Sequence, residues 1–197
     1  MADPKPLAAD PLMPTPLVPD TTAAVFGASG KIGRHVVALL QRRQCRVRAL
    51  VHRTPIPGAG VTCIPGDIGD PKAVDAVLDG ADWVLQLATA KEDPSTFFDV
   101  SIRGTFNVLE ACRAQPPKHL VFASSSSVYG AGARSPYRED DNTDQPVSYY
   151  GATKKANELM AYSYAHNHSL NLTGLRFFTV YGPWGRDRKS TRLNSSH

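Results

Sequence analysis

The sequence feature that most constrains the fold is the glycine-rich segment Gly27–Gly33, which lies between two apolar segments of different periodicity. Residues 22–26 form a short, β-prone apolar run. The residues that follow the glycines, up to position 43, place apolar side chains at 32, 36, 39 and 40, a spacing typical of one helix face. The sequence therefore predicts a buried strand, a tight loop and an amphipathic helix in immediate succession.

The three glycines have separate expected roles in such a loop. Gly27 permits the tight turn, Gly30 lets a pyrophosphate approach the backbone, and Gly33 lets the helix pack closely against the strand. The free N–H groups and the positive end of the helix then favour phosphate. The alternative is an ordinary glycine-rich turn, but strand, loop and helix agree with a dinucleotide site. The predicted cofactor-binding residues here are Gly27, Ser29, Gly30, Lys31, Ile32 and Gly33.

Length and charge narrow the class of protein. A chain of 197 residues suits one domain with a substantial core. The formal charge of +4 comes mostly from residues 186–197, which hold four cationic residues against one carboxylate. The remainder is close to neutral and offers no basic face, so we expect no nucleic-acid partner.

Cysteine, histidine and hydropathy patterns exclude other classes. The cysteines are three in number and form no C-x-x-C pair, which favours reduced thiols and a cytoplasmic location. No apolar run has the length of a membrane span, and the N-terminus has no signal-peptide pattern, so no membrane partner is expected. The six histidines form no ligand set, and we predict no metal site.

The chain divides into three predicted parts. Residues 1–20 contain six prolines and are predicted to be a disordered tail, with a proline-rich docking peptide as the alternative. Residues 21–186 are predicted to form an NAD(P)-binding Rossmann domain. Residues 187–197 show no periodicity, and we interpret them as an unstructured tail that arises from a sequence artefact; a natural polar tail is the alternative.

Strand and helix patterns alternate along the middle part. Further strands are predicted at 45–51, 61–65, 82–88, 120–123 and 170–178, and helices at 71–78, at about 95–114 and from Tyr150 through Tyr164. This alternation favours an α/β fold with a parallel sheet. We predict a Rossmann-like, doubly wound, three-layer α/β/α sandwich with strand order 3-2-1-4-5-6.

The end of the second strand bears on the choice of cofactor. An acidic residue there would bond the 2′-hydroxyl of NAD, whereas an arginine suits the 2′-phosphate of NADP. The sequence offers His52 and Arg53 and no carboxylate. It therefore favours NADP over NAD, the alternative being that Arg53 is a surface residue on a loop.

Three later motifs complete a family pattern. Ser124–Gly130 reads Ser-Ser-Ser-Ser-Val-Tyr-Gly, Tyr150 and Lys154 form Tyr-x-x-x-Lys, and Ser101–Ala111 contains Gly-Thr-x-Asn. With the glycine loop, these motifs resemble the extended, epimerase-like branch of the short-chain dehydrogenase/reductase superfamily, which is the NAD(P)-dependent epimerase/dehydratase family. The stretch 170–186 resembles UDP-glucuronate 4-epimerases and related UDP-sugar enzymes. The resemblance covers about residues 22–186.

The resemblance assigns roles to individual positions. It implies that Asp67 and Ile68 contact the adenine, with a turn residue as the alternative for Asp67, and that Leu87, Ala88 and Thr89 pass beneath the cofactor. Ser125 is implied as the catalytic hydroxyl, with Ser124 or Ser126 as alternatives if the register differs. Ser101 replaces the asparagine that in the family helps to hold the active-site helix.

The tyrosine and lysine pair is expected to move the proton. Tyr150 and Lys154 are four residues apart and share a helix face, whereas Tyr149 would pair with the uncharged Thr153. A free tyrosine is a poor base near pH 7, and a lysine cation beside it favours the phenolate. We therefore predict Tyr150 and Lys154 as catalytic, with Lys154 also binding the nicotinamide ribose. Lys155 is interpreted as a solvated charge.

These observations predict an NAD(P)-dependent nucleotide-sugar epimerase or dehydratase that acts by transient hydride transfer. One alternative is an oxidoreductase on a small carbonyl or alcohol, and another is a non-catalytic nucleotide-sensing module. The expected substrate is a UDP-sugar, and the full-length enzyme is expected to be a homodimer. We expect the C-terminal substrate domain to be missing from these residues. The chain as given should therefore bind cofactor weakly and turn over no UDP-sugar.

Overall fold

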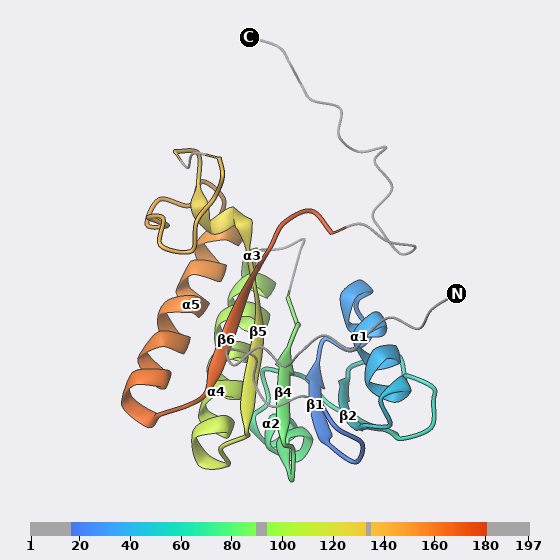
Figure 1. Cartoon of the computed structure of the whole chain (residues 1–197). Coiled ribbons are helices and arrows are strands. Elements are labelled where there is room, and N and C mark those ends of the chain that lie inside the picture. Colours follow the sequence, from blue (N-terminus) through green and yellow to red (C-terminus); the bar gives the residue numbers. More distant parts are fainter. Residues whose placement is uncertain (1–16, 90–93, 133–134, 181–197) are drawn as a thin grey trace, which may run out of the picture.

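A computed structural model describes residues 17–89, 94–132 and 135–180 of the chain. Its centre is a six-stranded sheet in which every neighbouring pair of strands is parallel (Figure 1). The order β3-β2-β1-β4-β5-β6 confirms the predicted 3-2-1-4-5-6 arrangement. The strands are β1 (Thr22–Phe26), β2 (Arg46–Val51), β3 (Val61–Pro65), β4 (Trp83–Gln86), β5 (His119–Ser125) and β6 (Leu172–Phe177).

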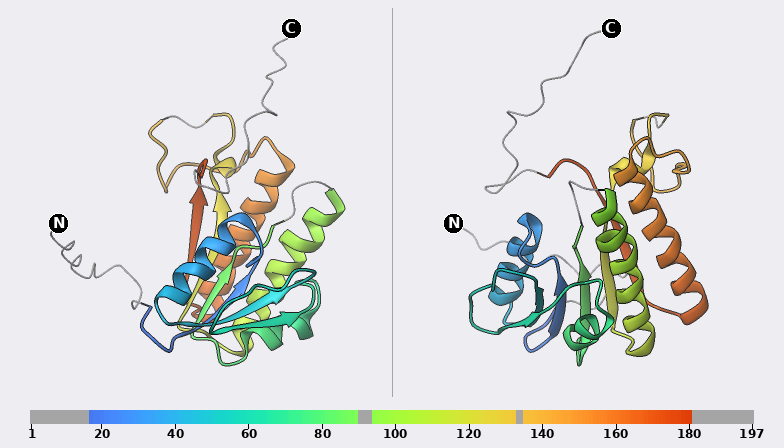
Figure 2. Two further views of the ribbon diagram at one scale, coloured as in Figure 1. Left: turned by 90° about the vertical axis from the view of Figure 1, so that its right-hand side faces the viewer. Right: turned by 180° about the vertical axis from the view of Figure 1, so that it is seen from behind.

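Helices cover both faces of this sheet and make the predicted three-layer sandwich (Figure 2). One face packs against α1, and the other packs against α2, α4 and α5. The helical elements are α1 (Lys31–Arg42), α2 (Pro71–Leu78), α3 (Pro94–Thr96), η1 (Phe97–Arg103), α4 (Gly104–Ala114), η2 (Ser126–Tyr129) and α5 (Tyr149–His168). Among the residues described, no helix is both long and apolar enough to cross a membrane.

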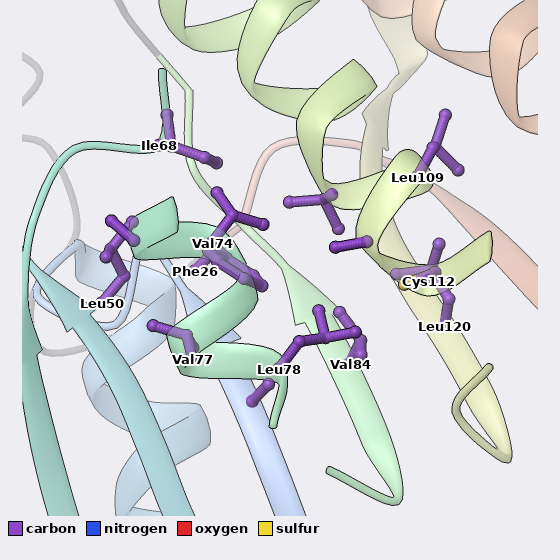
Figure 3. Packing of buried hydrophobic residues seen from close by; sticks show 14 of the residues in the cluster. Phe26, Leu50, Ile68, Val74, Val77, Leu78, Val84, Leu109, Cys112 and Leu120 are labelled. Carbon is purple, nitrogen blue, oxygen red and sulfur yellow. The ribbon is translucent and has the colours of Figure 1, made fainter. Parts of the chain in front are cut away.

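The core explains why the central strands are so apolar. All five residues of β1 are buried, as expected for a strand covered by helices on both faces. Phe26, Val84 and Leu120 project from three neighbouring strands toward the helices (Figure 3). They pack there against side chains of α2 and α4, such as Val74 and Leu109.

The predicted boundaries differ from the observed ones mainly in one helix. The stretch predicted as a helix over 95–114 is a short α-turn, a π-helix over 97–103 and then α4. Apolar periodicity does not separate a π-turn from an α-turn over so few residues. Strand β5 also runs beyond the predicted residue 123 to Ser125, which pairs with Phe177 of β6.

The parallel sheet decides where a site can form. The carboxyl ends of parallel strands lie at the same edge, where nucleotides bind in such folds. Gly27, His52 and Leu87 each follow a strand at that edge. Most of the predicted N-terminal tail and all of the predicted 187–197 tail lie outside the described residues, so these boundaries stay predictions.

Candidate functional site

The glycine loop leaves no room for a side chain at two of its positions. A Cβ on Gly27 would lie 2.6 Å from the amide nitrogen of Ala88, and one on Gly33 would lie 2.1 Å from the carbonyl oxygen of Gly27. Gly27 also has a φ of +81°, a conformation that glycine adopts readily. Gly30 donates its N–H to Gly27 O at 3.0 Å and caps α1 without a side-chain hydrogen bond. The geometry thus fits a phosphate on the N–H groups at the start of α1.

A cleft of about 370 Å³ opens above this loop at the carboxyl edge of the sheet. It brings together nearly all of the residues predicted to bind cofactor through the loop and the strand ends. These are Gly27, Ser29, Gly30, Lys31, Ile32, Gly33, His52, Asp67, Ile68, Leu87, Ala88 and Thr89.

Three further residues of the cleft lining were missed by the sequence analysis: Leu50, Gly66 and Val100. Gly66 directly precedes Asp67, and its position at the end of β3 could have identified it. Val100 comes from the π-helix, far away in sequence, and no local pattern pointed to it.

His52 and Arg53, which follow β2, differ in their place relative to the cleft, and Asp67 and Ile68, which lie shortly after β3, differ in burial. His52 lines the cleft, whereas Arg53 is exposed and is not part of the lining. Asp67 accepts a hydrogen bond from the amide of Gly69 at 2.8 Å, which matches the turn role considered as its alternative. Ile68 beside it is 5% exposed and belongs to the core.

Helix α5 places a buried lysine beside a tyrosine. Lys154 is 2% exposed, and its Nζ donates to the carbonyl oxygen of Ala123 at 2.8 Å. The same Nζ lies 5.8 Å from the ring centroid of Tyr150. Burial lowers the pKa of Lys154 to about 8. Ser148 caps α5 by accepting a hydrogen bond from the amide of Gly151, and this cap fixes the residue at which the helix begins.

The two adjacent tyrosines differ in exposure, and the two adjacent lysines differ in their contacts. Tyr149 is 53% exposed, whereas Tyr150 is half-buried. The interpretation of Lys155 as a solvated charge was wrong. Its Nζ donates to Thr143 Oγ1 at 2.6 Å and lies 3.3 Å from the carboxylate of Asp144, so it anchors the loop before α5.

A hydrogen bond that the sequence analysis missed distinguishes Ser124 from Ser125. Ser124 donates its hydroxyl to Glu158 Oε1 at 2.5 Å, and Glu158 in turn holds Arg176 through two bonds of 3.0 Å. Ser125 accepts the amide of Ser127 at 3.2 Å and donates its own hydroxyl to Ser127 Oγ at 3.2 Å, a longer bond to a neutral group. The Ser124 hydroxyl is therefore occupied by a structural contact, and Ser125 remains the better candidate of the two.

Ser101 replaces the family's asparagine and is fully buried in η1. Its Oγ has no hydrogen-bond partner in the part of the chain that the structure describes. The hydrogen bond to the active-site helix that the family's asparagine implied is thus not made by Ser101.

Comparison with known proteins agrees with the motifs. The model of the NAD dependent epimerase/dehydratase family matches residues 23–196, beyond the boundary at 186 expected from the sequence. UDP-glucuronate 4-epimerase 3 of Arabidopsis thaliana is 42% identical over 184 residues, covering 82% of this chain and 43% of that protein. The chain thus spans less than half the length of this curated relative.

Solved structures show the same fold. MoeE5, solved in complex with UDP-glucuronic acid and NAD, is 36% identical with a TM-score of 0.74 and covers 84% of this chain and 57% of that one. The UDP-glucuronic acid 4-epimerase of Bacillus cereus, solved with UDP-glucuronic acid and NAD, is 29% identical with a TM-score of 0.75. That match covers 84% of this chain and 59% of the other. Motifs, cleft and comparisons together place this chain in the NAD dependent epimerase/dehydratase family.

Proposed function

We propose that this chain supplies the cofactor-binding and catalytic part of an NAD(P)-dependent nucleotide-sugar epimerase. The observation that carries the proposal is the buried Lys154 beside Tyr150, on the helix that follows β5 in a fold with a fitting nucleotide cleft. Relatives named for UDP-glucuronate 4-epimerisation support a UDP-sugar as the substrate.

A bound nicotinamide would accept hydride from a sugar carbon and return it to the other face, which inverts that carbon with no net redox change. The proposed part of Tyr150 is to take the proton of the sugar hydroxyl and give it back when the alcohol reforms. The Lys154 ammonium, whose Nζ lies 5.8 Å from the ring centroid of Tyr150, would attract the negative charge that develops on the phenol oxygen during this step. Ser125 would donate its hydroxyl to the reacting oxygen, because the neighbouring Ser124 hydroxyl is occupied by Glu158.

The choice between NAD and NADP depends on the residues that follow β2. The solved relatives are described in complex with NAD, and they do not support a preference for NADP. The preference for NADP proposed from the sequence depends on Arg53 and on the lack of a carboxylate directly after β2. Arg53 is exposed and directly follows His52, which lines the cleft.

The test of the reaction uses the full-length product of the gene that encodes these residues. Incubation with UDP-glucuronate and a catalytic amount of NAD should yield UDP-galacturonate while absorbance at 340 nm stays flat. In a second assay with NAD in excess over the sugar nucleotide, accumulation of reduced cofactor in proportion to substrate would instead show an oxidoreductase. Tight cofactor binding with neither product would show a nucleotide-sensing module.

A further inference from the structure

The motif Gly104-Thr105-Phe106-Asn107 at the start of α4 has no role in the proposed reaction, yet it contacts two walls of the nucleotide cleft. Thr105 and Asn107 are 3% and 8% exposed, so their polar atoms are hidden from solvent. Buried polar groups of this kind are costly unless they are paired. What they pair with therefore shows what the motif does.

Asn107 holds the wall that follows β3. Its Nδ2 donates to the carbonyl oxygen of Ile68 at 2.9 Å, across 39 positions of sequence. Gly104, one turn earlier, packs directly on the same residue, because a Cβ there would lie 2.7 Å from Ile68 Cγ2. Ile68, which lines the cleft, is thus held by two contacts from α4, one to its backbone and one to its side chain.

Thr105 holds the wall that follows β4 through a relay. Gln86 donates its Nε2 to Thr105 Oγ1 at 3.2 Å and uses its Oε1 to accept the amide of Ala88 at 2.8 Å. That amide nitrogen is the atom that a Cβ on Gly27 would meet at 2.6 Å. The Thr105–Gln86 relay therefore sets the surface against which the glycine loop packs.

We propose that Asn107 and the Thr105–Gln86 pair are positioning residues for the nucleotide cleft, with Asn107 acting at the adenine end and Thr105 at the phosphate end. The inference rests on the proposed function, since it takes the cleft to be the NAD(P) site. A single helix then sets the spacing between the Ile68 wall and the Ala88 wall. Neither Thr105 nor Asn107 lines the cleft itself.

The test is calorimetric titration of the 197-residue chain with NAD, AMP and nicotinamide mononucleotide. Thr105→Val keeps the shape of the side chain and removes the acceptor, and it should weaken NAD binding roughly tenfold, which is about 1.4 kcal/mol. Thr105→Ser keeps the hydroxyl and should restore binding. Asn107→Ala should weaken AMP and NAD by a similar factor and leave nicotinamide mononucleotide unchanged.

The matched control is Thr173→Val. Thr173 also makes one side-chain hydrogen bond, to His119 at 2.9 Å, but at the other end of the sheet, and its loss should leave NAD binding unchanged. Equal loss in the control, or folded Thr105→Val protein that binds like the wild type, would overturn the inference. If Asn107→Ala does not fold, the Thr105 series still decides. Wild-type protein that binds none of the nucleotides would overturn the proposed function instead, and the inference with it.

Discussion

The two halves of the sheet build their parts of the site by different means. In the half around β1 and β2, the loop Gly27–Gly33 shapes the cleft by the absence of side chains and offers backbone N–H groups. In the half around β5 and β6, buried and half-buried side chains shape the site: Lys154 binds Ala123, and Glu158 joins Ser124 to Arg176. Substitutions that add a side chain should therefore disrupt the first half, and substitutions that remove a charged side chain should disrupt the second.

This difference also separates binding from chemistry. A backbone cradle recognises phosphate whatever the substrate, whereas the phenol of Tyr150 matters when a proton moves. Substitutions in the two halves should thus fail in different assays.

The largest effect is expected for Tyr150→Phe in the full-length protein. Loss of a general acid–base group typically lowers the rate by about 10²–10⁴-fold, and NAD affinity should change little. Tyr149→Phe is the matched control, because Tyr149 is 53% exposed and lies one residue away. Equal damage by the two substitutions in a turnover assay would show that the register of the pair is wrong.

The buried charge of Lys154 should appear in the pH dependence of stability. Burial lowers the pKa of Lys154 from 10.5 to about 8, so between these pH values the unfolded chain binds more protons. The free energy of unfolding should therefore rise by about 3 kcal/mol as the pH is raised from 8 to 10.5.

Urea unfolding at a series of pH values measures this rise against Lys154→Met, which lacks it. The exposed Lys31→Met variant controls for the loss of a lysine from the other half. Curves for wild type and Lys154→Met that run parallel from pH 8 to 10.5 would refute the account of the buried charge.

Gly33→Ala should disrupt the phosphate site in the half around β1 and β2. The added Cβ would meet the Gly27 carbonyl oxygen at 2.1 Å, so the loop must move. Losing two charge-assisted hydrogen bonds to phosphate, each worth about 1.5–3 kcal/mol, should weaken NAD binding about 100-fold or more. Gly132→Ala, where nothing lies within 4 Å, is the control in the same calorimetric titration. Unchanged NAD affinity in Gly33→Ala would remove the loop from the binding site.

The smallest effect concerns the cofactor preference. Arg53→Ala should weaken NADP binding by about fivefold and leave NAD binding unchanged, since an exposed ion pair contributes about 1 kcal/mol. Competitive titration with both cofactors measures the ratio. Tighter binding of NAD than NADP by the wild type would show that Arg53 does not set the preference.

The sequence predicts the first half better than the second. Strand, glycine loop and helix are contiguous, so local pattern alone predicts the phosphate cradle, whereas Asp67, Ile68 and the segment Leu87–Thr89 were predicted from the family resemblance. The alternation of strands and helices predicts the parallel sheet, and the glycine loop after the first strand points to the dinucleotide-binding fold and its strand order. By contrast, Val100, Glu158 and the anchoring of Lys155 depend on side chains that meet only in the folded chain. The relay from Thr105 through Gln86 to Ala88 is of the same kind.

The central claim is that nucleotide binds at the carboxyl edge of the sheet, in the cleft above the glycine loop. Amide hydrogen exchange of the 197-residue chain, with and without saturating NAD, tests it most directly. Protection should appear in Gly27–Gly33, Gly66–Ile68 and Leu87–Thr89, and it should be absent from Gly58–Thr62 at the opposite end of the sheet. Protection confined to that opposite end, or no protection in the glycine loop, would contradict the account.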